Sequence, residues 1–202
     1  MSRKSGIREV KKTYLVLGDG RTEQYYLKHL KALRGYKYSI RPSLFSSITI
    51  ETAENIIDSH LSGGCDQIIY FTDYDTIVNQ NKINDFQRLK KKYAYNSQVF
   101  ICETMPCIEF WFLMHYFKTT QEFINASEVI KLLLKYMKNY CKEEAFLKNL
   151  NWVQSICKDN KLETAIKNST LILKQQCSGD KGKHFPYSKV HLALEYFESQ
   201  VK

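Results

Sequence analysis

The sequence predicts an α/β protein with a mostly parallel four-stranded sheet flanked by helices, followed by a helical C-terminal portion. Short apolar runs alternate with amphipathic stretches up to about residue 117, and this alternation favours parallel strands joined by helices. The remaining residues contain amphipathic stretches, and no segment rich in Gly, Ser or Pro separates the two parts. We therefore expect an α/β domain over residues 10–120 and a helical extension over 121–202 that packs on it.

The first four elements are expected before residue 62. The run TYLVLG at 13–18 is short, apolar and closed by glycine, as in a buried strand. Residues 22–33 place Tyr and Leu side chains at helical spacing. Residues 38–45 alternate like a strand, but Pro42 lies among them, which indicates a sheet edge or a bulge. Residues 53–61 are typical of a helix, and a glycine pair follows them.

The next four elements include the strongest strand signal of the chain, DQIIYFT at 66–72. Residues 81–93 form an amphipathic pattern with a helical period, and residues 98–102 are a further short strand. Pro106 suits the first turn of a helix, which predicts an apolar helix over 107–117.

The C-terminal part is predicted to be entirely helical. Helical patterns occur at 126–140, at 142–148, between 152 and 176, and at 188–200. The polar segment 177–186 contains glycine and proline and is predicted to be a loop.

Composition restricts the class of protein. Hydrophobic residues make up 44% of the 202 residues, which allows a substantial core. No run approaches the roughly 20 apolar residues that a membrane span needs. No apolar segment follows the basic start of the chain, so we expect a cytoplasmic location. Six cysteines without a C-x-x-C pair favour reduced thiols over disulfides or structural zinc.

The formal net charge of +9 favours polyanionic partners such as DNA or RNA. A lysine-rich surface in water also explains it. Arg21, Lys181 and Lys183 are the candidate contacts to nucleic-acid phosphates, and a solvated loop is the alternative for the two lysines.

Acidic residues follow two of the predicted strands. Asp19 lies between two glycines after residues 13–18, and Asp73 and Asp75 follow residues 66–72. Ligands collect at the carboxyl ends of parallel strands. Because residues two apart in an extended chain point the same way, Asp73 and Asp75 would form a site for a hard cation. A plain turn at Asp19 and a capping Asp73 are the alternatives.

Glu109 is a single acid in the apolar helix predicted at 107–117. A carboxylate there is costly unless it is paired, bound to metal, or at a rim where it reaches water. If the strands at 13–18 and 66–72 are neighbours, Asp19, Asp73 and Asp75 meet at one edge, and Glu109 can join them. Their repulsion would be relieved by a cation. We therefore expect Mg²⁺ or Mn²⁺ to polarise a phosphodiester and activate water at this edge.

Four segments resemble motifs of the RloB family, in the same order along the chain. Residues 15–26 (LVLGDGRTEQYY) are similar to its opening strand with Glu-Gly, Thr-Glu and an aromatic. Residues 71–75 (FTDYD) resemble its Phe-Asp-x-Asp motif, and residues 105–115 (MPCIEFWFLMH) resemble its Asn-Pro-x-Phe-Glu-x-Trp-x-x-x-His segment. Residues 185–191 (FPYSKVH) are similar to a C-terminal element.

This resemblance implies a Toprim-like fold, a role in bacterial defence against phage (abortive infection), and an ATPase partner encoded nearby. It implies that Asp19 stands for the Toprim glutamate and that Asp73 and Asp75 stand for its Asp-x-Asp pair. These three residues would then be the metal ligands and the catalytic acids.

Further family positions and departures qualify this assignment. Glu23 and Glu109 match acids of the family, and His115 matches a histidine. These three residues are additional candidates for the site. His115 is a candidate general base, but it lies six residues beyond Glu109, on a different helical face, and a buried or capping histidine is the alternative. Asp19 replaces the usual Glu and is one methylene shorter, Met105 replaces Asn, and Ile108 replaces Phe. A misplacement of about 1 Å can cost on the order of 100-fold in rate.

The predicted function is that of an RloB-like phage-defence nuclease that depends on a divalent metal and acts on nucleic-acid phosphodiesters. The alternative is a catalytically impaired subunit that binds nucleic acid or an ATPase, which the shorter acid at Asp19 motivates. Residues 73–77 also resemble the nucleophile loop of haloacid-dehalogenase phosphatases, but that family has Thr or Val where this chain has Ile77. A glycosyltransferase Asp-x-Asp motif is the remaining alternative.

Overall fold

The computed structural model describes residues 12–41, 48–178, 182 and 184–199. The described strands form one sheet and are, in chain order, β1 (Tyr14–Gly18), β2 (Ser39–Arg41), β3 (Gln67–Asp73), β4 (Val99–Met105) and β5 (Tyr187–Ser188). Their order across the sheet is β2-β1-β3-β4-β5. The first four strands are parallel, and β5 is antiparallel to β4. The mostly parallel sheet is therefore confirmed.

The predicted count of four strands is wrong, because the described residues contain a fifth strand from the C-terminal part. Ser188 pairs with Thr104 and Tyr187 pairs with Met105. A strand of two residues has no measurable alternation, so sequence periodicity cannot detect it. The expectation of an entirely helical C-terminal part fails for the same reason.

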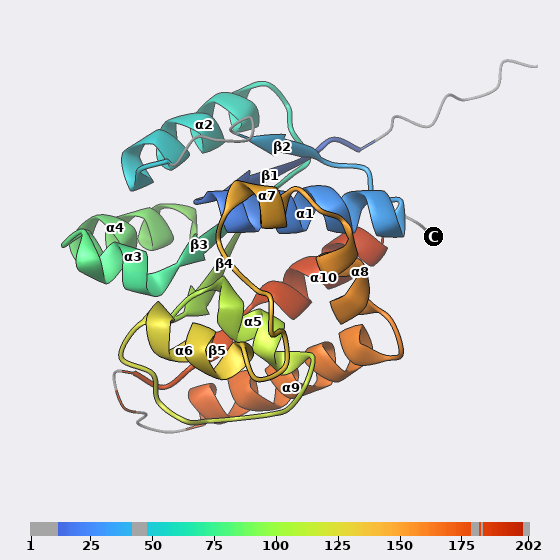
Figure 1. The fold of residues 1–202 in the computed structure, drawn as a ribbon. Coiled ribbons are helices and arrows are strands. Elements are labelled where there is room, and N and C mark those ends of the chain that lie inside the picture. The colour runs from blue at the N-terminus through green and yellow to red at the C-terminus, as the bar shows by residue number, and fades with distance from the viewer. Residues whose placement is uncertain (1–11, 42–47, 179–181, 183, 200–202) are drawn as a thin grey trace, which may run out of the picture.

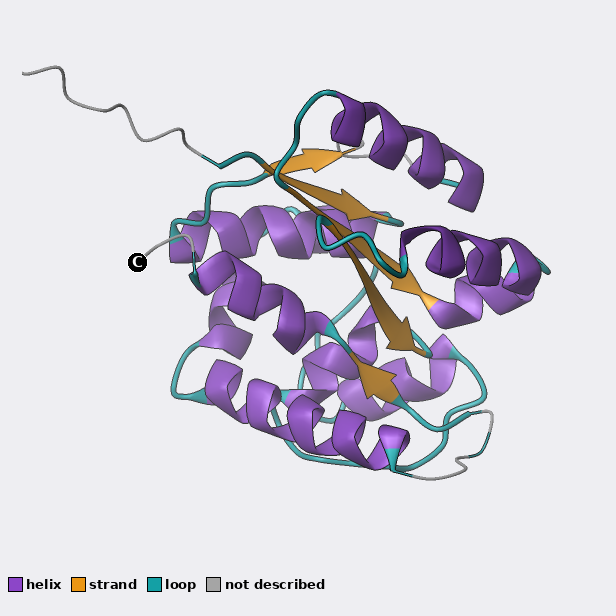
Figure 2. Ribbon diagram, turned by 180° about the vertical axis from the view of Figure 1, so that it is seen from behind, coloured by secondary structure: helices purple, strands orange, loops and turns teal. Residues whose placement is uncertain are grey.

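Ten helices are described, and they surround the sheet on both faces (Figures 1 and 2). They are α1 (Arg21–Arg34), α2 (Ile50–Ser62), α3 (Tyr74–Asn79), α4 (Ile83–Tyr93), α5 (Ile108–Met114), α6 (Ala126–Leu133), α7 (Glu144–Leu147), α8 (Asn151–Cys157), α9 (Lys161–Cys177) and α10 (Val190–Glu198). None of the described helices is long and apolar enough to cross a membrane.

Two apolar clusters lie on opposite faces of the sheet, as the alternation of side chains along β1 requires. Leu15 and Leu17 pack into the cluster that includes α2, α3 and α4. Val16 packs into the larger cluster, which includes α1, α5 and the C-terminal helices. All residues of β3 are buried, as expected for a central strand covered on both faces.

The predicted elements differ from the structure mainly in the C-terminal part. The helix predicted at 126–140 ends at Leu133, and the one predicted between 152 and 176 is divided into α8 and α9. Asp159 and Asn160 have positive φ angles of 56° and 59° between these helices. Because an L residue in this left-handed region cannot continue a right-handed helix, the chain changes direction there. The predicted strand at 38–45 is reduced to β2, and its remainder lies outside the described residues.

Candidate functional site

The parallel pairing of β1 with β3 places two predicted acids at the same edge of the sheet. Gly18 is in register with Phe71, so Asp19 follows the end of β1 next to Asp73, the last residue of β3. Asp19 and Asp73 line one cavity of about 290 Å³, which Glu23 and Lys142 also line. The edge is the carboxyl edge of the parallel strands, where ligands bind in open α/β sheets.

Asp19 is held in place by two side chains from β3. The Tyr70 hydroxyl donates to Oδ1 over 2.7 Å, and the Thr72 hydroxyl donates to Oδ2 over 2.5 Å. Burial raises the pKa of Asp19 to about 6, although these two hydrogen bonds act in the opposite direction. Both carboxylate oxygens therefore already have a protein partner, and a large part of the acid is shielded from water.

Glu23 and Asp73 are buried acids that line the same cavity. Glu23 lies in the first turn of α1, with 4% of its surface exposed, and Asp73 is 7% exposed. Burial raises the pKa of Glu23 to about 7, and the charges of Asp19 and Glu109 add to the rise. Burial also raises the pKa of Asp73 well above its ordinary value, with further contributions from Glu23, Glu109 and Asp75. These acids disfavour one another's ionised forms.

Glu109 lies in the first turn of α5, is fully buried and is not among the residues that line the cavity. Its Oε1 accepts hydrogen bonds from the Tyr140 hydroxyl over 2.6 Å and from Lys142 Nζ over 2.8 Å. Its Oε2 has no hydrogen-bond partner among the described residues. The alternative in which Glu109 reaches water at a rim is therefore wrong.

Lys142 brings a positive charge into the acidic cluster. Its side chain is 46% exposed, and it lines the cavity while its ammonium contacts Glu109. Burial lowers the pKa of Lys142, but attraction by Glu109 outweighs this and the pKa lies above its ordinary value. The ammonium thus partly neutralises acids that were expected to need a metal ion.

Asp75 does not lie where extended-chain geometry placed it. Asp73 is the N-cap of α3 and the chain becomes helical at Tyr74, so the alternation assumed for an extended segment does not apply. Asp75 Oδ2 accepts a hydrogen bond from the backbone N–H of Ala126 at the start of α6, over 3.3 Å. Asp75 is not among the residues that line the cavity, although its charge contributes to the raised pKa of Asp73.

The structure places one of the other candidate residues at the cavity and one away from it. Arg21 lines the cavity and is exposed, whereas Lys181 and Lys183 lie outside the described residues. His115 is buried at the end of α5 and does not line the cavity. Its Nδ1 lies 3.0 Å from the carbonyl oxygen of Trp111, and burial lowers its pKa to about 4. The structure therefore supports the buried, capping interpretation of this histidine.

Sequence reasoning missed four residues of the site, namely Tyr70, Thr72, Tyr140 and Lys142. Tyr70 and Thr72 alternate on β3 and could have been assigned to one face from that period. Lys142 is one of 30 Lys and Arg residues, and nothing near it in the sequence marks it. Only the path of the chain after α6 brings Tyr140 and Lys142 to Glu109.

The donor set of the cavity suits a hard cation only in part. The described residues contain no group of three or more His, Cys, Asp or Glu side chains placed to hold a metal ion. Asp19, Glu23 and Asp73 nevertheless offer carboxylate oxygens to one cavity. Mg²⁺ usually keeps several waters and needs one or two carboxylates, so this cavity fits a hydrated Mg²⁺ or Mn²⁺ better than a fully protein-bound metal.

The fold and the site thus define an α/β protein with a buried acidic cluster at the carboxyl edge of its sheet. Residues 14–197 match the RloB-like protein family, which covers the chain from β1 to α10. The chain belongs to the RloB-like family. Comparisons with curated proteins and with solved structures gave no match.

Proposed function

We propose that this RloB-like protein is a phage-defence nuclease that hydrolyses nucleic-acid phosphodiesters with the help of Mg²⁺ or Mn²⁺. The observation that carries the proposal is the cavity shared by Asp19, Glu23 and Asp73 at the carboxyl edge of the sheet. Packing of the core does not require three acids with raised pKa values in one cavity. Groups of acids with raised pKa values are typical of functional sites.

Asp73 and Asp19 are the residues that would hold the metal ion, with waters completing its shell. When bound, a divalent metal supplies positive charge to the phosphate and lowers the pKa of a coordinated water. Asp19 would bind the metal through its carboxylate oxygens, which hydrogen bonds from Tyr70 and Thr72 already orient. Asp75 would act at longer range, through its charge on Asp73.

The remaining chemistry falls to residues of the cavity wall. Glu23 has a pKa of about 7, so it can accept a proton from water or return one near neutral pH. Arg21 is exposed at the rim, where its guanidinium can bind a phosphate through two N–H donors. When nucleic acid binds, the Lys142 ammonium would leave Glu109 and contact a phosphate oxygen of the nucleic acid instead.

A second candidate function is a non-catalytic subunit that binds nucleic acid or an ATPase. One specific observation favours it: Lys142 already pairs with Glu109, and both oxygens of Asp19 accept hydrogen bonds from protein hydroxyls. These contacts hold Asp19 and Glu109 in place without a metal ion. The two functions therefore differ in one measurable property, which is whether the cavity binds a divalent cation.

The test combines calorimetric titration with Mn²⁺ and a nuclease assay on single-stranded and double-stranded DNA and RNA. We expect the wild-type chain to bind Mn²⁺ and cleave, and Asp73→Asn to lose both. Asp85→Asn, on the surface of α4, is the matched control and should behave as wild type. Equal residual cleavage by wild type and Asp73→Asn would reveal a contaminant and refute the nuclease. An absence of Mn²⁺ binding by the wild-type chain would favour the non-catalytic function.

A further inference from the structure

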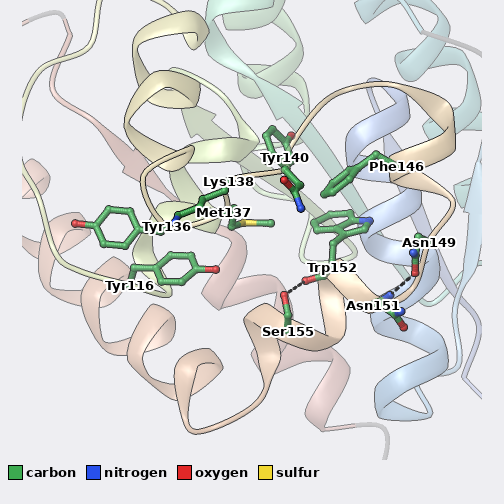
Figure 3. Close-up of a pocket in the computed structure, with 11 residues that line it drawn as sticks. Tyr116, Tyr136, Met137, Lys138, Tyr140, Phe146, Asn149, Asn151, Trp152 and Ser155 are labelled. Atoms are coloured by element: carbon green, nitrogen blue, oxygen red, sulfur yellow. Dashed lines mark hydrogen bonds between the residues drawn. The ribbon is translucent and has the colours of Figure 1, made fainter.

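A second cavity, of about 310 Å³, lies beside the acidic site and has aromatic walls (Figure 3). Tyr116 and Tyr136 form one wall, with ring centroids 5.1 Å apart and an interplanar angle of 26°. Phe146 and Trp152 form another, with ring centroids 6.0 Å apart and an angle of 27°. Its volume is at the lower end of the range for small-ligand sites, about 300–1,000 Å³.

The polar groups of this cavity are amides and a lysine. Asn139, Asn149 and Asn151 line it together with Lys138, and none of the described lining residues is acidic. All three asparagines are exposed, and Asn149 Oδ1 accepts a hydrogen bond from the backbone N–H of Asn151 over 2.9 Å. Each amide offers a donor and an acceptor in one plane, which matches the edge of a nucleobase.

The cavity is connected to the acidic site through one short segment. Tyr140 lines the aromatic cavity, and its hydroxyl donates to Glu109. Lys142, two residues further along, lines the acidic cavity. Because two extended residues span at most about 7 Å, the walls of the two cavities are close neighbours here.

We propose that the aromatic cavity binds an unpaired nucleobase, and hence that the nucleic acid this protein engages is single-stranded. Aromatic rings stack on any base face, and the amides can contact the base edge. Lys138 and the net charge of +9 suit the phosphates, and no acid in the wall repels them. The bases of a duplex are stacked inside it and cannot enter without being flipped out.

The base-binding site does not depend on catalysis, but its place beside a cleavage site rests on the proposed function. Tyr136 is the best residue to change, because 46% of the residue is exposed and its ring forms one wall together with Tyr116. Tyr136→Ala removes a stacking surface with little loss of core packing. Tyr95→Ala is the matched control, since Tyr95 is fully exposed after α4 and lines neither cavity.

Binding is measured by fluorescence anisotropy of a labelled single-stranded oligonucleotide in EDTA, where cleavage cannot interfere. We expect wild type and Tyr95→Ala to bind equally, and Tyr136→Ala to bind about tenfold more weakly, which corresponds to ~1.4 kcal/mol. An abasic strand of the same length, with the same phosphates, should bind the wild-type chain more weakly by a similar factor. A duplex of the same sequence should also bind more weakly. The abasic comparison needs no variant and remains decisive if Tyr136→Ala does not fold.

Equal affinity for the normal and abasic strands, or no binding of single strands, would overturn the base-binding proposal. The two proposals can fail separately. If Asp73→Asn binds the oligonucleotide normally and the wild-type chain shows neither Mn²⁺ binding nor cleavage, the base site stands and the nuclease fails. If cleavage is metal-dependent but insensitive to Tyr136→Ala and to base removal, the nuclease stands and the base site fails.

Discussion

Replacing Glu23 by glutamine is expected to stabilise the metal-free fold at pH 8 and to leave its stability unchanged at pH 4. Glu23 is buried beside Asp19 and Glu109, and its pKa rises from 4.5 to about 7 on folding. A raised acid pKa means that the native state holds more protons than the unfolded chain between these values. The stability of the wild-type chain therefore falls as pH rises through this window.

The size of the effect follows from the two pKa values. At about 1.4 kcal/mol per pKa unit, the difference between 4.5 and about 7 amounts to about 3 kcal/mol at pH 8. Below pH 4 the carboxyl group is protonated in both states, so glutamine changes little. The measured gain will be smaller than this maximum if the new amide nitrogen lacks an acceptor in the cavity.

Urea unfolding in EDTA at pH 8 and pH 4 measures the difference, and Glu195→Gln is the control. Glu195 is exposed on α10 and has no salt bridge among the described residues, so its substitution should have little effect at either pH. If Glu23→Gln changes the stability by the same amount at pH 8 and at pH 4, ionisation of this carboxyl group does not weaken the fold. The electrostatic account of the cavity would then be wrong.

Two more predictions concern the residues that face Glu109. Tyr140→Phe removes the hydroxyl that donates to this buried carboxylate, so urea unfolding should show that the free energy of unfolding falls by about 1–3 kcal/mol. An unchanged free energy of unfolding would mean that the hydrogen bond is not formed in solution. Lys142→Met removes an ammonium that competes with a metal ion, so Mn²⁺ affinity measured by calorimetry should rise about tenfold, or ~1.4 kcal/mol. Lys167 is exposed, and the control Lys167→Met should leave Mn²⁺ affinity unchanged. A fall in Mn²⁺ affinity would show that Lys142 helps to organise the site instead of competing for it.

The part of the site that could be predicted from the sequence is the part fixed by the parallel sheet. Once TYLVLG and DQIIYFT are assigned as neighbouring parallel strands, their carboxyl ends must share an edge, and Asp19 and Asp73 follow those ends. The position of Asp75 could not be obtained in the same way. Whether the chain stays extended or turns into α3 after Asp73 depends on local packing that alternation does not encode.

Contacts between distant segments account for what sequence patterns missed. β5 is held by the pairing of Ser188 with Thr104, which are far apart in the sequence, and its two residues have no period of their own. Lys142 likewise has no local signature, since its role depends on the turns that follow α6. Glu109 was identified as unusual because an acid within an apolar helix is costly, but its partners could not be named.

The partners of Glu109 have a consequence for how the two predicted parts of the chain work together. The acids of the cluster come from the ends of β1 and β3 and from the starts of α1 and α5, all before residue 120. Tyr140 and Lys142, which both contact Oε1 of Glu109, come from the part predicted as a helical extension. Without them the fully buried carboxylate would weaken the fold, because an unpaired buried charge is strongly unfavourable. The C-terminal part therefore brings the positive charge of Lys142 to the candidate site as well as covering the sheet. The segment that carries Tyr140 also forms a wall of the aromatic cavity, so any ligand that moves this segment must alter the contacts of Glu109.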